Sequence, residues 1–196
     1  MTDPKADLHQ YLRAAREAVL WKLEGLSEYD VRRPLTPTGT NLLGVVKHLA
    51  ILETEYFGLV FGRPFTGSLH YDEDEPNSDL WATADESRED VVAFYRRAGA
   101  HADATIEELD LDARADVPWW GEERRHAALH LVLVHMVAET NRHAGQFDVL
   151  REQLDGAVGH RREVDNMAAP GDEAAWAAHR ARLEDLARRF RRDAGV

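Results

Sequence analysis

The sequence predicts an all-α protein built from a bundle of four long helices, with a further helix near the C-terminus. Apolar residues recur at steps of three and four through four long segments, which is the pattern of core-facing helices. No segment shows the sustained alternation of apolar and polar residues that strands produce. The chain has 196 residues, which is enough for one domain with a sizeable core. Four helices of this length, joined partly by long loops, are typical of bundles.

The first two helices are separated by a loop rich in proline. The first helix is predicted to run roughly from Pro4 to Leu26, because Asp3 followed by Pro4 is a helix-start signal. Its apolar stripe is Leu8, Leu12, Ala15, Val19, Leu23 and Leu26. The segment "RRPLTPTGT" is predicted to be a loop. The second helix is predicted to run from about Thr40 to about Phe61. Its apolar face includes Leu42, Val45, Leu49, Leu52 and Tyr56.

A long polar connection leads to the third and fourth helices. Its acidic run at 72–75 lacks the glycine and the spaced glutamate of an EF-hand loop, so we interpret it as disordered or as a mobile flap. The stretch "SRED" at 87–90 has the pattern of a capping box that opens the third helix. That helix carries Val91, Tyr95, Ala98, Ala102, Ile106 and Leu109. The fourth helix follows a loop containing "DVPWWGEERR" and is predicted to end near 155–156. Its apolar stripe is Leu129, Val132, Met136, Phe147, Leu150 and Leu154.

The chain is predicted to consist of a bundle over residues 1–156 and a C-terminal extension over residues 157–196. Within the extension, residues 157–171 look irregular, and residues 172–192 are expected to form a helix that packs on the bundle or on a partner. We interpret the arginines of "HRARLEDLARRFRRD" as a solvated helix face, with anion binding as the alternative.

Composition and charge argue against several classes of function. The formal net charge is −12, from 24 basic and 36 acidic residues, so nonspecific nucleic-acid binding is not expected. No run approaches the roughly 18 apolar residues that indicate a membrane span. The N-terminal stretch "MTDPKADLHQ" is polar and acidic, unlike a secretory signal, so we expect a cytoplasmic protein. The chain contains no cysteine, so any thiol chemistry requires an external thiol.

The apolar stripe of the fourth helix is interrupted by Glu139 and His143. These residues are four apart, so they lie on one face, about 6 Å apart along the axis. Burying a carboxylate without a partner costs several kcal/mol, so a partner is required from elsewhere in the chain. His48 borders the apolar stripe of the second helix and would point into the bundle. Glu53 and Glu55 would add a carboxylate nearby, but we interpret both as solvated.

His48, Glu139 and His143 together offer two imidazoles and one carboxylate. This donor set suits zinc, nickel, iron(II) or manganese with open coordination positions. Such positions allow a metal to bind water or a thiolate, lower its pKa and orient a substrate. The alternative interpretation is a surface Glu–His pair together with an unrelated half-buried histidine.

Other residues are candidates for the surroundings of this site. His135 is either a hydrogen-bonding partner of a metal ligand or a core histidine. Asn41 and Arg142 are candidates for contacting a polar ligand, with helix-end or surface roles as the alternative. Trp119 and Trp120 either wall an apolar substrate pocket or pack the loop before the fourth helix.

The sequence resembles the DinB-like superfamily of metal-binding four-helix bundles over roughly residues 5–156. The segments "TNLLGVVKHLAILETEYFG" and "LVLVHMVAETNRHAGQFDVLRE", the latter followed by "DG", carry the resemblance. The superfamily has a histidine on its second helix and a pair four residues apart on its fourth, followed by a small residue, glycine and glutamine. His48, Glu139 and His143 occupy these positions, and "AGQ" follows His143.

Glutamate at position 139 resembles the branch that includes mycothiol-dependent maleylpyruvate isomerase and related thiol transferases. Many other DinB-like proteins carry histidine there. The same branch often has histidine where this chain has Gln146, so the chain departs from it at that position. The resemblance implies an up-down-down-up bundle, a homodimer and a divalent metal, with zinc favoured over nickel, iron or manganese. It also implies mycothiol as the cosubstrate.

We therefore expect a metal-dependent enzyme, a thiol S-transferase or isomerase, that transfers or adds a low-molecular-weight thiol to an electrophilic small molecule. The metal would hold the thiol as a thiolate, and His48, Glu139 and His143 would be its protein ligands. Two alternatives remain open: a non-catalytic metal-binding protein of a stress response, and a metal-dependent hydrolase that activates water.

Overall fold

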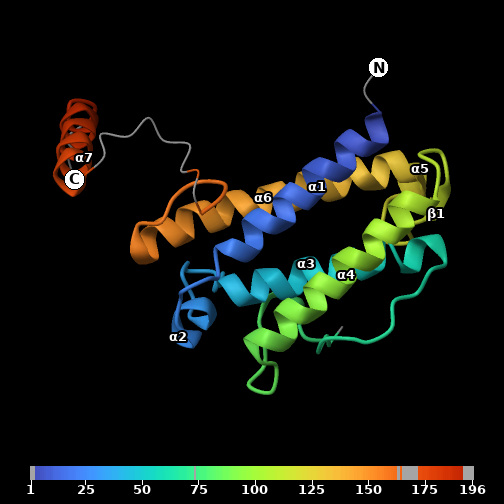
Figure 1. Cartoon of the computed structure of the whole chain (residues 1–196). Helices are drawn as coiled ribbons and strands as arrows, with labels where there is room; N and C mark the ends of the chain where they lie inside the picture. The colour runs from blue at the N-terminus through green and yellow to red at the C-terminus, as the bar shows by residue number, and fades with distance from the viewer. Residues whose placement is uncertain (1–2, 73, 163, 165–171, 192–196) are drawn as a thin grey trace. The chain divides into compact units, whose positions relative to one another are not determined.

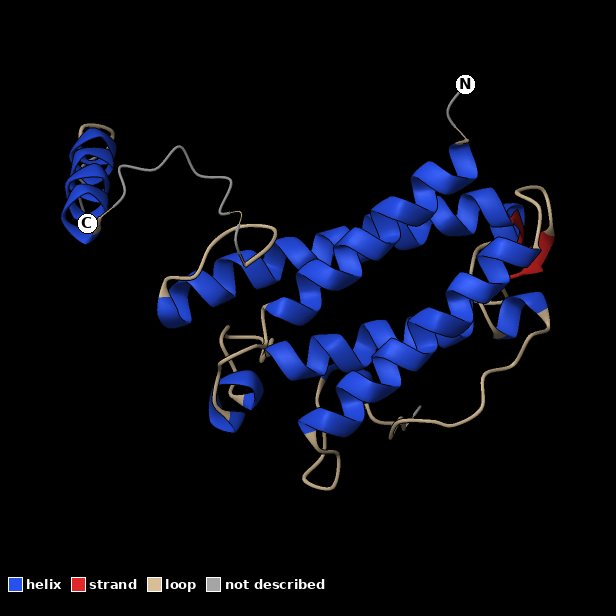
Figure 2. Ribbon diagram, viewed as in Figure 1, coloured by secondary structure: helices blue, strands red, loops and turns tan. Residues whose placement is uncertain are grey.

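The computed structural model describes residues 3–72, 74–162, 164 and 172–191 (Figure 1). These residues are mostly helical, with one small two-stranded sheet, so the predicted all-α class is confirmed (Figure 2). The chain divides into two compact units, Met1–Asp165 and Asn166–Val196. The predicted domain boundary at residue 156 and the up-down-down-up helix order stay predictions.

Four long helices dominate the first unit. They are α1 (Pro4–Trp21), α3 (Leu42–Tyr56), α4 (Arg88–Glu108) and α6 (Leu129–Asp155). α1 packs along α6, and α3 packs along α4 (Figures 1 and 2). α3 also contacts α6, which brings the second and fourth predicted helices together.

The helix ends follow signals that are visible in the sequence. At the start of α1, the Asp3 side chain accepts a hydrogen bond of 3.0 Å from the backbone N–H of Lys5. At the start of α4, Ser87 Oγ accepts a hydrogen bond of 3.0 Å from the backbone N–H of Asp90, as the capping-box pattern predicts. α6 ends at Asp155 and is capped by Gly156, whose φ of +78° lies in the left-handed region that glycine favours.

The first two predicted helices end earlier than expected. α1 ends at Trp21 and is followed by a turn, whereas the prediction extended the helix to residue 26. α3 ends at Tyr56, and a short 3-10 helix, η1 (Leu59–Phe61), follows it. Gly58 separates the two, and a Cβ there would lie 2.3 Å from the carbonyl oxygen of Thr54. The backbone therefore folds back too closely for any residue with a side chain.

Several short elements were not predicted. They are α2 (Glu28–Arg32), η2 (Ser78–Leu80), β1 (Arg114–Asp116), α5 (Glu122–Arg125) and β2 (His126–Ala128). The two strands pair antiparallel, with Ala115 opposite Ala127. Strands of three residues are too short to produce a recognisable alternation.

The described part of the acidic run lies in a hydrogen-bonded turn that leads into η2. The backbone N–H of Asp72 donates to Ser78 Oγ at 3.0 Å, and the backbone N–H of Asp74 donates to Asp72 Oδ1 at 2.9 Å. Glu73 lies outside the described residues. These bonds hold together much of the segment that we interpreted as a flap.

The second unit contains the predicted C-terminal helix, α7 (Glu173–Arg188). Asp172 caps it by accepting a hydrogen bond of 2.7 Å from the backbone N–H of Ala175. None of its residues is buried. Residues 163 and 165–171, part of the stretch expected to be irregular, lie outside the described residues. Packing of α7 on the bundle or on a partner stays a prediction.

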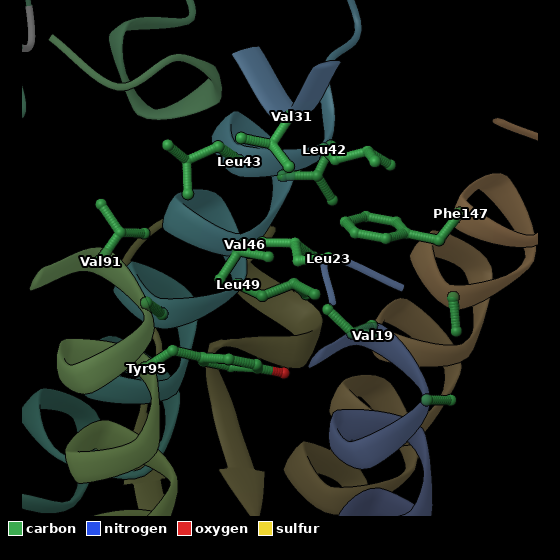
Figure 3. Close-up of a cluster of buried hydrophobic side chains, with 14 of the residues drawn as sticks. Val19, Leu23, Val31, Leu42, Leu43, Val46, Leu49, Val91, Tyr95 and Phe147 are labelled. Carbon is green, nitrogen blue, oxygen red and sulfur yellow. The ribbon is translucent and has the colours of Figure 1, made fainter. Parts of the chain in front are cut away.

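Two clusters of buried apolar side chains form the core of the first unit. Figure 3 shows the first cluster, to which α1 to α4 and α6 contribute. Its labelled members are Val19, Leu23, Val31, Leu42, Leu43, Val46, Leu49, Val91, Tyr95 and Phe147. The second cluster includes Leu12, Tyr56, Phe57, Ile106, Leu129, Leu133 and Met136. These residues include most of the predicted stripe positions.

A buried ion pair links α1 to α3. Arg16 Nε and Nη2 donate to the two carboxylate oxygens of Glu53 at 2.6 and 2.7 Å, and Arg16 Nη1 donates to Asp103 of α4 at 2.5 Å. The interpretation of Glu53 as solvated is therefore wrong, because its side chain is only 1% exposed. Burial alone would lower the pKa of Arg16, but the charges and hydrogen bonds of these carboxylates raise it above its ordinary value.

The substitution Glu53→Ala is expected to lower the free energy of unfolding by about 3–5 kcal/mol, because it removes one partner of a buried pair. Glu107→Ala is the matched control, since it removes an exposed ion pair with Arg13 and is expected to cost at most about 1 kcal/mol. Urea denaturation of both variants measures the difference. Equal, small losses would contradict a structural role for the buried pair.

Candidate metal centre

α3 and α6 bring His48, Glu139 and His143 together. His48 lies on α3, and the other two residues lie one turn apart on α6. Glu139 Oε1 is 3.0 Å from His143 Nε2 and 3.8 Å from His48 Nε2. One ligand atom of each residue lies within 4.8 Å of the others, which is close enough for all three to hold one metal ion. The structure therefore assembles the predicted triad, while its role as a ligand set stays a prediction.

Both histidines use Nδ1 for a hydrogen bond away from the centre of the triad. His48 Nδ1 lies 2.6 Å from Asp79 Oδ2, and His143 Nδ1 lies 2.9 Å from Gln146 Oε1. Carboxylate and amide oxygens accept hydrogen bonds, so Nδ1 of each ring is placed to donate one. In the neutral tautomer that donates from Nδ1, the lone pair of Nε2 faces Glu139.

This arrangement tests whether the residues fit a cation. With Nδ1 protonated, His143 Nε2 and Glu139 Oε1 are two electron-pair donors only 3.0 Å apart. Two such atoms repel each other unless a proton or a metal ion lies between them. Two imidazole nitrogens and a carboxylate oxygen are also ordinary ligands of zinc and of other divalent transition metals. The donor set therefore fits a divalent metal.

The position of Asp79 depends on a close approach between η2 and α3. A Cβ at Gly44 would lie 1.8 Å from the carbonyl oxygen of Leu80, so only glycine permits this contact. Asn41 strengthens the contact, because its Nδ2 donates to the same carbonyl at 3.2 Å while its Oδ1 caps α3. The Asn41 side chain therefore has a helix-end role. His48 follows Gly44 by one helical turn and meets Asp79 there.

A cavity of about 680 Å³ opens beside the triad. It is lined by Thr38, Gly39, Thr40, Val45, His48, Asn77, Leu80, Trp81, Glu139, Arg142, His143 and Gln146. Arg142 is a lining residue, and its side chain is 70% exposed with Nη1 3.9 Å from Glu139 Oε2. Its contact with a ligand stays a prediction. The cavity has room for a small molecule next to the convergent ligand atoms.

The remaining predicted residues belong to a separate aromatic cluster around Tyr56. Trp119 and Trp120 both donate from Nε1 to Tyr56 Oη, at 2.8 and 2.9 Å. The ring of His135 lies 4.9 Å from that of Tyr56 and 5.1 Å from that of Trp120. Burial lowers the pKa of His135, against the opposing charge of Glu139. None of these residues lines the cavity beside the triad, so the two tryptophans pack the loop instead of walling that cavity.

Asp79, Asn77 and Trp81 were missed because they lie in the long connection before α4. The periodicity of apolar residues does not predict where such a loop passes in space. Lys47 is the one sequence feature that points to this contact, because a lysine within an apolar helix needs a polar partner. Its side chain is fully buried, and Nζ donates to the carbonyl of Trp81 and to Glu86, each at 3.0 Å.

Comparison with known protein families assigns this chain to one of them. The family model described as mycothiol S-transferase matches residues 7–156. The chain belongs to the mycothiol S-transferase family. This result confirms the resemblance to the thiol-transferase branch of the DinB-like superfamily. A comparison with curated proteins found no match. Within the described residues of this mycothiol S-transferase family member, no helix is long and apolar enough to cross a membrane.

The hydrogen bond from His48 to Asp79 is expected to strengthen metal binding. Asp79→Ala removes the acceptor that fixes the imidazole, so we expect metal affinity to fall about 10- to 100-fold. Asp79→Asn retains an oxygen that accepts from Nδ1 and should lose less affinity. Competition with a chromogenic zinc chelator measures this order, and thermal melting checks that each variant folds. Equal zinc affinity in the wild type and in Asp79→Ala would refute the positioning role.

Proposed function

We propose that this protein is a metal-dependent mycothiol S-transferase that forms a bond between the sulfur of mycothiol and an electrophilic carbon of a small molecule. One observation carries the proposal. In a member of the mycothiol S-transferase family, two imidazole nitrogens and a carboxylate converge in the wall of a cavity of about 680 Å³.

His48, Glu139 and His143 are the proposed ligands of a divalent metal, with zinc favoured over nickel, iron and manganese. A divalent cation bound there would lower the pKa of a coordinating thiol and so supply a thiolate at neutral pH. Three protein ligands leave coordination positions open for such a thiol. The chain has no cysteine, so its sequence contains no thiol that would compete for those positions.

The other residues of the site orient these ligands. Asp79 and Gln146 hold the Nδ1 protons of the two histidines and so direct both Nε2 atoms inward. Glu139 contributes a single negative charge to the ligand set, so a divalent site keeps a net positive charge that attracts an anionic thiolate. Arg142, at the exposed side of the cavity, adds positive charge for an anionic group of a substrate.

The proposal includes the wider arrangement expected of the superfamily. We propose that α1, α3, α4 and α6 form a DinB-like four-helix bundle in up-down-down-up order, and that residues 1–156 are its domain. We also propose that the protein forms a homodimer and acts in the cytoplasm on small molecules, without nucleic-acid partners.

Transfer of mycothiol is tested with zinc-loaded protein, mycothiol and monochlorobimane. The expected result is fluorescence that develops faster than in the protein-free blank. His143→Ala is expected to abolish the excess rate, whereas Asn141→Ala, at an exposed position of α6 with a hydrogen bond only to its own helix, should keep it. No excess rate with zinc, nickel, iron or manganese would contradict the proposal. Turnover of esters or amides without thiol would instead support the hydrolase alternative.

The ligand set predicts an order of metal affinity. Wild type and Glu139→His should bind metal well, because a neutral imidazole also donates a lone pair at position 139. Glu139→Ala and His143→Ala should bind far less, since each leaves two protein ligands. Metal content and melting temperature, measured with and without EDTA, give the order. Full metal occupancy in both alanine variants would show that α6 does not hold the metal.

A further inference from the structure

An apolar groove continues from the triad cavity along α6. It has a volume of about 410 Å³. Its lining residues are Thr36, Thr40, Arg142, Gly145, Gln146, Val149 and Leu150. Thr40, Arg142 and Gln146 also line the triad cavity, so the two spaces meet at these three residues. A molecule that lies in the groove would therefore have one end near the triad.

The groove differs in chemistry from the cavity that it adjoins. Among its described lining residues, Arg142 is the only charged one, and it lies at the shared edge. Val149 is 56% exposed even though it lines a concave surface. An apolar group that covered Val149 would remove its surface from water, which is favourable. The polar side chains of the groove are those of Thr36, Thr40, Gln146 and Arg142, and most of its surface is apolar. The triad cavity, in contrast, also contains the Glu139 carboxylate and two imidazoles, and a larger share of its surface is polar.

Gly145 keeps the groove open. It lies in the interior of α6, where glycine is less stabilising than alanine. A Cβ at this position would meet no atom within 4 Å, so no close neighbour requires glycine. The missing side chain instead leaves free space in the wall of the groove.

We infer that this groove binds the apolar part of the electrophilic substrate, with the reactive carbon at the Gln146 end. The inference rests on the proposed function and names its substrate class: an electrophile with an apolar tail. The polar cavity then remains for the thiol cosubstrate. In the reaction, the thiol sulfur bonds to the electrophilic carbon, and the leaving group departs with the electron pair of the broken bond. The thiol proton passes to solvent.

A small molecule fits the groove better than a protein segment does. Its volume of about 410 Å³ lies within the range of small-molecule sites. The three residues that line both spaces also place an occupant of the groove next to the triad. A substrate must lie there, whereas a structural partner has no need to.

The test compares 2-chloroacetamide with N-hexyl-2-chloroacetamide, which share a leaving group and differ only in the apolar tail. With mycothiol and the zinc-loaded full chain, we expect kcat/KM to be at least about tenfold higher for the hexyl compound. Val149→Glu should remove this preference, so that the two compounds react with similar kcat/KM. Val134→Glu is the matched control, because Val134 is 40% exposed on α6 and lines neither space.

Gly145→Leu tests the same inference, because the added side chain would fill the groove. Ala138→Leu, at an exposed position of α6, is its control. Calorimetric titration with unreactive N-hexylacetamide adds a readout that does not depend on catalysis. We expect binding to the wild type and to both controls, and at least about tenfold weaker binding to Val149→Glu and Gly145→Leu.

The outcomes separate this inference from the proposed function. Turnover that shows no preference for the hexyl tail would overturn the assignment of the groove and leave the proposed function intact. Absence of thiol transfer to any electrophile would overturn the proposed function and, with it, the substrate assignment. A smaller species of Val149→Glu in light scattering would show that the groove contacts a second copy of the chain, which also overturns the inference.

Discussion

The orientation of two imidazole rings is the constraint on which the candidate centre depends. His48 and His143 each have two ring nitrogens, and only Nε2 of each ring faces Glu139. Asp79 and Gln146 fix this choice by binding the Nδ1 atoms at 2.6 and 2.9 Å. Without these acceptors, either ring would be free to change its tautomer or to rotate, and the three ligand atoms would no longer converge.

α3 connects this centre to the rest of the first unit through three polar side chains. Lys47 binds the segment before α4, through Trp81 and Glu86, and so holds one wall of the cavity. His48 contacts Asp79 of η2 and faces the pair on α6, whereas Glu53 is paired with a buried arginine of α1. Buried polar groups are stable only with partners, so these contacts restrict how α3 sits against its neighbours.

Helical periodicity predicted the four long helices. Two of them, α3 and α6, carry the triad. Periodicity placed Glu139 and His143 on the inward side of α6 and His48 at the border of the stripe of α3, and the structure brings these residues together. Such a prediction works because positions three or four residues apart share one helical face. Periodicity carries no information about partners in loops, so Asp79 and its approach to Gly44 were not predicted.

Because periodicity does not reveal contacts between distant segments, it also led to the wrong interpretation of Glu53 and left other features of the fold unpredicted. Glu53 was interpreted as solvated because its partner, Arg16, lies 37 residues earlier on a helix whose packing angle the pattern does not reveal. For Trp119 and Trp120 the sequence left a pocket wall and loop packing open, and their indole N–H groups are directed to the hydroxyl of Tyr56. The strands β1 and β2 have only three residues each, too few to show alternation.

The most direct measurement of the central claim is a crystal structure of the zinc-loaded protein, with the metal located by its anomalous scattering. We expect one zinc ion bound by Nε2 of His48, Nε2 of His143 and a carboxylate oxygen of Glu139, each at about 2.0–2.2 Å. Nδ1 of His48 should remain hydrogen-bonded to Asp79. Zinc bound elsewhere, or a triad that stays metal-free in saturating zinc, would contradict the account.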